Sequence, residues 1–179
     1  MKRIFFYLAA STLMMACNNE KKPVEAAAET KEDKAAVVLP YTAAYSSSFE
    51  AGNPEYSATI LQGSWKDWET NKMENMKSWV ADTILALLND NTVIRGVDGL
   101  QARWTKSRSE YTSVIDTVQA VIPVYSTDKK ENWVLVWATE INTDAHGKKD
   151  TVAVMETWRI NKDGKADMLL QYDRHARKK

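Results

Sequence analysis

Residues 151–172, TVAVMETWRINKDGKADMLLQY, decide the fold of this chain. Val, Thr, Trp and Ile make up most of residues 151–160, a composition that is typical of a β-strand. The turn-forming residues 161–164, Asn-Lys-Asp-Gly, come next, and a second apolar run covers residues 166–172. This order predicts two antiparallel strands that are joined by a tight hairpin.

Two further strands precede this hairpin. Residues 115–125 and 132–141 are rich in β-branched and aromatic side chains, and polar segments at 127–131 and 144–149 follow them. Successive hairpins predict an antiparallel meander. Side chains alternate along the strand 132–141, which puts Trp133, Leu135 and Trp137 on one face and Val134, Val136 and Ala138 on the other. Both faces are apolar, so we expect helices to cover one and a second copy of the chain to cover the other, giving a homodimer.

Apolar residues recur at helical spacing before the strands. Residues 55–72 bring Trp65 and Trp68 onto one helical face, which predicts a helix. The preceding pair Asn53-Pro54 suits its entry, with Asn as the cap and Pro in the first turn. A shorter helix is expected around residues 41–50.

A change of period marks the next elements. Residues 73–80 predict a short helical segment, and residues 83–88 a first strand that ends in a turn at 89–91. Residues 98–113 predict a third main helix, with Asp98 as its cap. Helices followed by a meander predict an α+β domain with the helices on one face of the sheet.

The first residues have the pattern of an export signal. Met1-Lys2-Arg3 is basic, and residues 4–16 carry no charge, as in the n-region and h-region of a secretory signal peptide. A membrane-spanning helix needs about 20 apolar residues, so this run is too short to span. We therefore expect residues 1–16 to be a signal peptide.

The single cysteine, Cys17, directly follows this run. Residues 13–17, LMMAC, resemble the lipobox of bacterial lipoproteins, with the small Ala16 before the cysteine and Met14 in place of the usual leucine. We expect a lipid anchor on Cys17, including palmitate, and a location in the bacterial cell envelope with the outer membrane as the anchoring membrane. The alternatives for Cys17 are a buried small hydrophobe or a reactive thiol.

Composition divides the remainder into a tether and one domain. Residues 17–40 have no aromatic side chain and mix both charges with alanine, which predicts a flexible tether. Residues 41–179 suit a single domain. Removing Lys2 and Arg3 with the signal leaves 22 basic against 24 acidic residues. This balance argues against nucleic acid as a partner.

Three motifs carry a family resemblance. They are Trp-Val-Ala-Asp at residues 79–82, Arg-Gly at 95–96 and, above all, ETWRINKDGK at 156–165. In their order the chain resembles the nuclear transport factor 2-like superfamily, which includes ketosteroid isomerases and SnoaL-like polyketide cyclases. The resemblance covers roughly residues 55–173. It implies a cone-shaped α+β fold of about three helices packed on a curved, mostly antiparallel sheet.

The resemblance also implies positions for a site. In the isomerase branch a carboxylic acid and a tyrosine bind the developing oxyanion, and an aspartate acts as the base. Glu156 falls at the position of that acid and Trp65 at that of the tyrosine. The base position falls at Leu88 or Asn89, neither of which takes up a proton, and the nearest carboxylate is Asp90. The catalytic candidates are therefore Glu156 and Asp90.

An apolar cavity lined by aromatic side chains is the expected binding site. The residues expected to line it are Glu156, Trp65, Trp68, Trp79, Trp104, Trp137, Trp158 and Tyr172. For each tryptophan the alternative is core packing, and for Glu156 it is a salt-bridged strand residue. Other strand carboxylates, Asp116, Glu140, Asp167 and Asp173, are expected to be solvated. The sequence holds no His or Cys cluster, so we expect no metal site and no cofactor.

Three functional hypotheses stay open at this point. The leading one is a membrane-anchored lipoprotein whose cone binds a small, largely apolar molecule without catalysis, because a pocket acid is present and a base is absent. The second is an isomerase- or cyclase-type enzyme that uses Glu156 or Asp90. The third is a structural or partner-binding lipoprotein whose cone is filled by its own side chains.

Overall fold

The computed structural model describes residues 40–175. The expected signal peptide, Cys17 and all of the expected tether except its last residue lie outside this range. From Tyr41 onward the chain forms one compact unit. No helix in the described part is long and apolar enough to cross a membrane.

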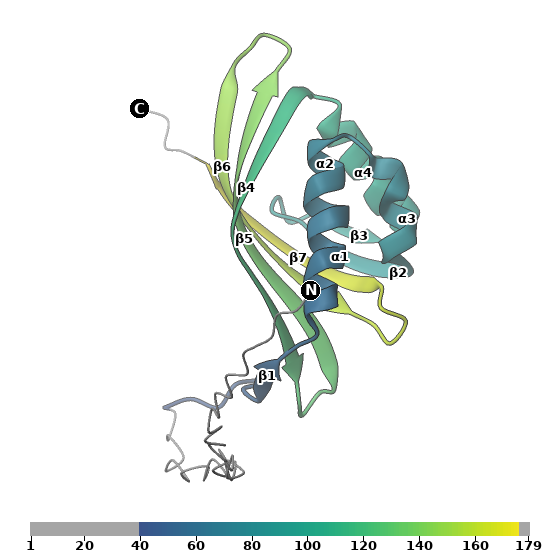
Figure 1. Cartoon of the computed structure of the whole chain (residues 1–179), viewed down its shortest axis with the longest axis vertical. Helices are drawn as coiled ribbons and strands as arrows, with labels where there is room; N and C mark the ends of the chain where they lie inside the picture. The colour runs from purple at the N-terminus through teal and green to yellow at the C-terminus, as the bar shows by residue number, and fades with distance from the viewer. Residues whose placement is uncertain (1–39, 176–179) are drawn as a thin grey trace, which may run out of the picture. The chain divides into compact units, whose positions relative to one another are not determined.

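Seven strands form one curved sheet in the order β1-β4-β5-β6-β7-β2-β3 (Figure 1). Their bounds are β1 Phe49–Ala51, β2 Val80–Leu87, β3 Val93–Arg95, β4 Tyr111–Ser126, β5 Glu131–Asp144, β6 Lys149–Ile160 and β7 Ala166–His175. The predicted antiparallel meander is confirmed as β4 to β7. The sheet continues beyond it through β2, which pairs with β7 in parallel, so the sheet is mostly antiparallel as expected.

The helical segments lie on the concave face of this sheet (Figure 1). They are α1 Pro54–Ile60, the π-helical turn η1 Leu61–Lys66, α2 Asp67–Glu69, the 3₁₀ turn η2 Met73–Asn75, α3 Met76–Trp79 and α4 Val97–Arg108. The expected α+β class, with the helices on one face of the sheet, is confirmed.

The first helical stretch starts where the sequence predicts. Asn53 caps it by accepting a hydrogen bond from the backbone N–H of Glu55 at 3.0 Å. The stretch runs through α1, η1 and α2 and ends at Glu69, three residues before the predicted end at 72, and Asn71 then adopts a positive φ of 58°. Gly63 is required within it, since a Cβ there would lie 2.3 Å from the Trp79 ring.

The predicted cap of α4 is wrong. Gly96, with φ of 86°, is the N-cap, and no side chain caps the helix. Asp98 instead forms an exposed ion pair with Lys77 at 2.7 Å. The helix ends at Arg108, before the predicted end at 113, because β4 already begins at Tyr111.

The helix expected at residues 41–50 is also wrong. Residues 49–51 form β1, which pairs with the edge of β4. Side-chain hydrogen bonds hold the segment before it, with Ser46 donating to Asp128 at 2.6 Å and accepting from Ser126 at 3.0 Å. Pairing with an existing strand edge satisfies backbone groups that a short isolated helix leaves open.

One hydrophobic core fills the space between the helices and the sheet. Trp158 is fully buried at its centre, with the Trp79 ring 5.2 Å and the Trp104 ring 6.0 Å from it in edge-to-face geometry. The long strands bend over this core, and the register of β4 shifts between Val118 and Ala120. Such a bulge increases local twist and allows the sheet to curve.

Candidate functional site

A cavity of about 300 Å³ lies between the helices and the concave face of the sheet. Its helical wall comes from η1, α2 and α4, and its floor from the ends of β5, β6 and β7 that lie away from the core. The volume is at the lower end of the usual range for small-molecule sites.

Three tryptophans form the aromatic wall: Trp65, Trp68 and Trp104 line the cavity. The rings of Trp68 and Trp104 are 5.9 Å apart and inclined at 68°, so they form a corner. Within residues 40–175, the buried indole N–H of Trp65 has no hydrogen-bond partner, and that of Trp68 is directed at Glu140, whose pKa it lowers. The wall therefore offers apolar ring faces and one unused donor.

The π-helical turn η1 places Ser64 and Trp65 together at this wall. A π turn inserts an extra residue and rotates the following side chains relative to a regular helix. Sequence periodicity predicts a regular helix here, so the turn is visible only in the structure. The exposed fraction of Trp65 is 5%, and its ring fills one side of the cavity.

Glu156 lies in the floor with 3% of its surface exposed. Its carboxyl accepts three hydrogen bonds, from Ser64 at 2.7 Å, Trp158 Nε1 at 2.9 Å and Gln171 at 3.0 Å. Burial raises the pKa of Glu156, and the three donors oppose that rise by favouring the ionised form. The predicted salt-bridge alternative is not found among the described residues, because its partners are neutral donors.

Two more acids lie beside Glu156 on the concave face. Asp116 of β4 and Glu140 of β5 are register partners, and Glu140 lines the cavity. Burial raises the pKa of Glu140, and burial together with the charges of Glu140, Glu69 and Glu156 raises the pKa of Asp116 to about 8. The expectation that Asp116 and Glu140 are solvated is therefore wrong.

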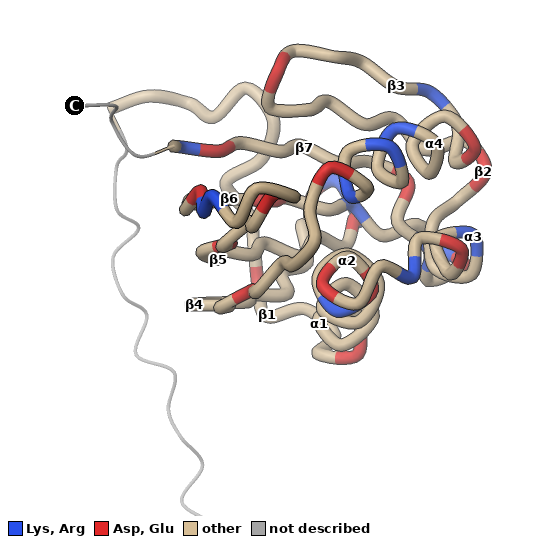
Figure 2. Tube along the Cα trace, turned by 90° about the horizontal axis from the view of Figure 1, so that it is seen from above, with Lys and Arg blue, Asp and Glu red and all other residues tan. Residues whose placement is uncertain are grey.

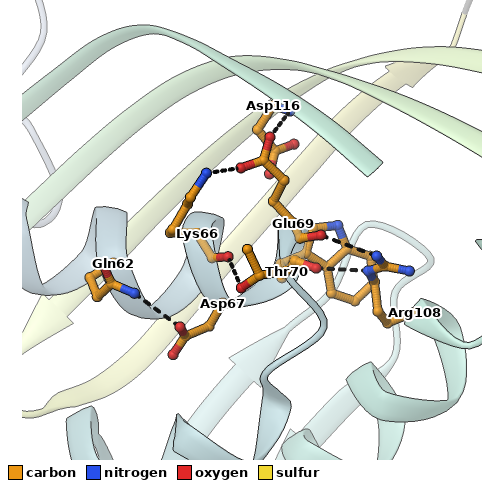
Figure 3. Close-up of polar contacts among 8 residues, drawn as sticks. Gln62, Lys66, Asp67, Glu69, Thr70, Arg108 and Asp116 are labelled. Atoms are coloured by element: carbon orange, nitrogen blue, oxygen red, sulfur yellow. Dashed lines mark hydrogen bonds and ion pairs between the residues drawn. The ribbon is translucent and has the colours of Figure 1, made fainter. Parts of the chain in front are cut away.

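Figure 3 shows the surroundings of Asp116. Glu69 of α2 points toward it, accepting from the Asp116 backbone N–H at 3.5 Å and from Lys66 in an ion pair. Neither carboxyl oxygen of Asp116 has a hydrogen-bond partner among the described residues. A pKa of about 8 means that Asp116 is mostly protonated at neutral pH, since no ion pair among the described residues compensates its negative charge.

Arg108 of α4 is the nearest buried cation, with 6% of its surface exposed. It donates to three backbone carbonyls, Trp68 O at 2.7 Å, Tyr111 O at 2.9 Å and Glu69 O at 3.1 Å. Figure 3 shows its guanidinium at the end of α2, where it binds the terminal carbonyls of Trp68 and Glu69. Arg108 thus ties α2 and β4 to α4 and lowers the pKa of Asp116 only in part.

Charged groups at the rim pair with one another. Arg103 binds Asp90 at 2.9 Å, and His175 lies 2.9 Å from Asp150 and 3.3 Å from Asp173. The hydrogen bond to Asp150 and the charge of Asp173 raise the pKa of His175. Asp90 is exposed in its turn and does not line the cavity, so the structure does not bring this catalytic candidate to the site.

The structure brings together half of the residues that the sequence assigned to the cavity. Glu156, Trp65, Trp68 and Trp104 line it. The other four do not: Trp79 and Trp158 pack in the core, and Trp137 and Tyr172 lie on the opposite face of the sheet. The sequence could not separate these groups, because aromatic residues serve equally in cores and in cavities.

Sequence reasoning missed Glu140, Asn142 and Asp116. Asn142 is 4% exposed, lines the cavity and donates to Glu140. One signal was present, since Ala138, Glu140 and Asn142 alternate along β5 and therefore share the buried face of Val134 and Val136. Among residues 40–175 no group of three His, Cys, Asp or Glu side chains is arranged to hold a metal ion.

Comparisons with known proteins identify the fold. No protein-family model matches the sequence, and no curated protein matches it. Among solved structures it is similar to a nuclear transport factor 2-like protein of unknown function from Exiguobacterium sp. 255-15, with a TM-score of 0.55, 16% identity and coverage of 64% of this chain and 98% of that one.

Two enzymes show a similar match. One is the Δ5-3-ketosteroid isomerase from Mycobacterium sp., with a TM-score of 0.53, 18% identity and coverage of 68% of this chain and 98% of that one. The other is an epoxide hydrolase from M. tuberculosis, with a TM-score of 0.52, 12% identity and coverage of 68% and 86%. At these identities the likeness concerns the fold alone. The described domain of this chain has the cone-shaped nuclear transport factor 2-like fold.

Proposed function

We propose that this chain is a lipid-anchored protein of the bacterial cell envelope whose cone binds a small molecule. The observation that carries the proposal is the cavity between the aromatic wall and the acidic floor, beside which several buried polar atoms of the described residues have no hydrogen-bond partner. Buried polar groups normally have hydrogen-bond partners, so a set without them beside a cavity points to a ligand. The same cone binds or converts small molecules in the isomerase and the hydrolase of similar fold.

The binding function is tested by filling the cavity. Val154 lines it, so Val154→Phe places a ring in the ligand space. Val93→Phe is the matched control, because Val93 is 56% exposed and is not among the residues that line the cavity. The measurement is thermal unfolding of the full chain in mild detergent against phenols, steroids, fatty acids and amines.

A ligand that binds only the native state must raise its stability. We expect a saturable rise in melting temperature with one class for the unmodified chain and for Val93→Phe, and no rise for Val154→Phe. A chain whose melting temperature does not respond to any class, or a response that survives in Val154→Phe, contradicts binding in this cavity.

An isomerase- or cyclase-type enzyme is the second candidate. The raised pKa values of Glu140 and Glu156 in one cavity favour it, because a raised pKa brings a carboxyl toward the pH at which an acid–base catalyst works. Leu88 and Asn89, at the position of the base, line the cavity and supply no proton acceptor of that strength. Turnover of a bound ligand that is lost in Glu140→Gln while binding persists would favour the enzyme over the binding module.

The anchor is proposed from Cys17 and the apolar run before it. In a bacterial host fed with labelled palmitate, the unmodified chain should take up label and stay with the membrane fraction. Cys17→Ser should take up none and retain residues 1–16, which mass spectrometry detects. Label in Cys17→Ser, or membrane release of the unmodified chain by high salt, contradicts a lipid anchor.

A homodimer through the convex face of the sheet is part of the proposal. This face carries apolar side chains that the described residues leave exposed, among them Ile115 at 52%, Ile122 at 45% and Tyr172 at 61%. Leu135 and Trp137 lie between them on β5. Exposed apolar area of this kind marks an interface, and a second copy offers an identical one.

Light scattering in detergent tests the dimer. The unmodified chain should have twice the mass of one chain, after subtraction of the detergent, and Ile122→Lys should have the mass of one chain. Lys129→Glu, on the exposed turn that follows β4, is the control and should leave the mass of the unmodified chain unchanged. A single-chain mass for the unmodified protein at micromolar concentration contradicts the dimer.

A further inference from the structure

The acids of the site outnumber the cations that can neutralise them. Asp116 and Glu140 are register partners on β4 and β5, and Glu156 shares the concave face on β6, where its register partner is Val136 of β5. Figure 2 shows acidic positions on β4, β5 and β6 and on α2, which faces them. Among residues 40–175 no ion pair reaches any of these three carboxyls.

The cations near the site are all engaged elsewhere. Arg108 is held by three backbone carbonyls, and Lys66 is paired with Glu69. At the rim, Arg103 is paired with Asp90, and His175 lies between two aspartates. The protein therefore gathers acids at a cavity without an ion pair to any of them within the described part, and the charge of Arg108 acts on Asp116 and Glu140 only in part. A bound cation would favour the ionised forms of these acids.

Neutral polar groups beside the cavity also lack hydrogen-bond partners within the described range. Asn142, of which 4% is exposed, shares the concave face with Glu140, and its Oδ1 has no hydrogen-bond partner within the described range. It is an acceptor beside the acids, so it needs a donor. On the opposite wall the indole N–H of Trp68 is directed at Glu140, whose pKa it lowers, and the indole N–H of Trp65 has no acceptor among the described residues.

The corner formed by the Trp68 and Trp104 rings suits a cationic ligand. The faces of tryptophan rings attract cations more strongly than those of other aromatic side chains, and ring corners are used to hold ammonium groups. Trp68 and Trp104 make such a corner against a floor that includes Glu140.

We propose that the cavity binds a small organic cation that carries both a protonated amine and an oxygen acceptor, an amino alcohol in its simplest form. The inference rests on the proposed binding function and names the class of ligand. The amine lies at Glu140 and Asn142, against the Trp68–Trp104 corner, and the oxygen accepts from an indole N–H. This assignment replaces the largely apolar ligand that the sequence predicts.

The test varies ligand charge at nearly constant size. The probes are 2-amino-1-phenylethanol as its ammonium, the neutral 1-phenyl-1,2-ethanediol and the anion mandelate. Calorimetry with the full chain in mild detergent at pH 7 measures the affinity of each. We expect the ammonium to bind at least about tenfold more tightly than the diol, and mandelate to bind most weakly. A diol or mandelate that binds as tightly as the ammonium overturns the proposal and leaves the binding function in place.

The variant Glu140→Gln removes the acid that the amine contacts. It should weaken the ammonium about tenfold and leave the diol within about twofold, because only the charge interaction is lost. Glu74→Gln, an exposed position in η2, is the matched control and should change neither affinity. Equal affinity of the ammonium for the unmodified chain and for Glu140→Gln overturns the proposal, and far-ultraviolet circular dichroism confirms that both variants are folded.

Proton release gives a second readout. Asp116 is faced by Glu140 and Glu156 from the sheet, by Glu69 and Lys66 from the helical stretch, and by Arg108 from α4. A bound cation favours the ionised form of Asp116, so binding at pH 7 should release protons, seen as a dependence of the binding heat on the buffer. Proton uptake on binding overturns the placement of the amine beside these acids. If none of the three probes binds, this proposal fails, and the wider ligand panel decides the binding function separately.

Discussion

The concave face of the sheet has two halves that differ in chemistry although the same strands build both. In the dry half, Val134, Val136, Trp158 and Leu169 are buried and pack against α1, α3 and β2. In the polar half, Asp116, Glu140, Asn142, Glu156 and Gln171 occupy the continuation of the same strand faces. The same strands, β5 to β7, therefore carry both halves.

The difference lies in how closely the helices approach. Over the dry half Gly63 lets the Trp79 ring lie directly on the helix backbone, so no space is left. Over the polar half Trp65, Trp68 and Trp104 stand on the helices and leave a cavity. One sheet face thus serves as a core where backbones meet closely and as a site where large rings hold the layers apart.

The largest expected effect comes from breaking the dry half. Trp158→Ala removes the largest fully buried side chain and should lower the free energy of unfolding by about 3–5 kcal/mol. Trp137→Ala, on the convex face of the same sheet, should cost only about 1–2 kcal/mol when both variants are made in the Ile122→Lys background, because its ring is partly exposed in the single chain. Chemical denaturation measures both. Equal losses for the two variants would show that the dry half is packed no more tightly than the convex face.

A stabilising effect is expected in the polar half. The pKa of Asp116 is about 8 in the folded chain against 3.8 in the unfolded chain, so the folded state keeps a proton that the unfolded state loses. Stability should therefore fall as pH rises from about 4 to about 8. Asp116→Asn cannot ionise and should be more stable than the unmodified chain by about 2 kcal/mol at pH 8, allowing for screening by solvent.

Denaturation at pH 4, 6 and 8 tests this. The advantage of Asp116→Asn should be absent at pH 4 and greatest at pH 8. Asp163→Asn is a control at an exposed turn and should show no such trend. A loss of stability at pH 8 in Asp116→Asn would mean that the ionised carboxylate has a stabilising partner.

The smallest effect concerns the boundary between the halves. Ser64→Ala removes one of the three hydrogen bonds that Glu156 accepts and should cost about 1 kcal/mol. Hydrogen bonds to ionised groups are stronger than those to neutral ones, so the loss should be smallest at pH 4, where the raised pKa of Glu156 keeps its carboxyl neutral, and should grow as rising pH ionises it. Ser78→Ala, whose hydroxyl bonds to an exposed backbone carbonyl, is the control and should show no pH trend. A loss in Ser64→Ala that is independent of pH would show that Glu156 does not titrate in this range.

The sequence by itself determined the strands of the meander, their hairpins and the helix that begins at Asn53. These follow from local chemistry, since strand alternation, turn residues and caps act over a few positions. It also determined that both faces of β5 are apolar. It assigned Glu156 and three of the tryptophans to the cavity, but by resemblance and composition, which do not show what a side chain touches.

Which acids form the floor of the cavity depends on the tertiary structure. Along β4 the positions that pair with the concave-face residues of β5 are even-numbered up to Val118 and odd-numbered from Val121, because the bulge before Ala120 shifts the register. The simple alternation of inward and outward side chains fails at a bulge, so the sequence predicts a solvated Asp116. Three other features likewise depend on residues far apart in the chain, whose contacts exist only once the layers have packed. They are the π turn at Trp65, the parallel pairing of β2 with β7 and the shared concave face of Asp116, Glu140 and Glu156.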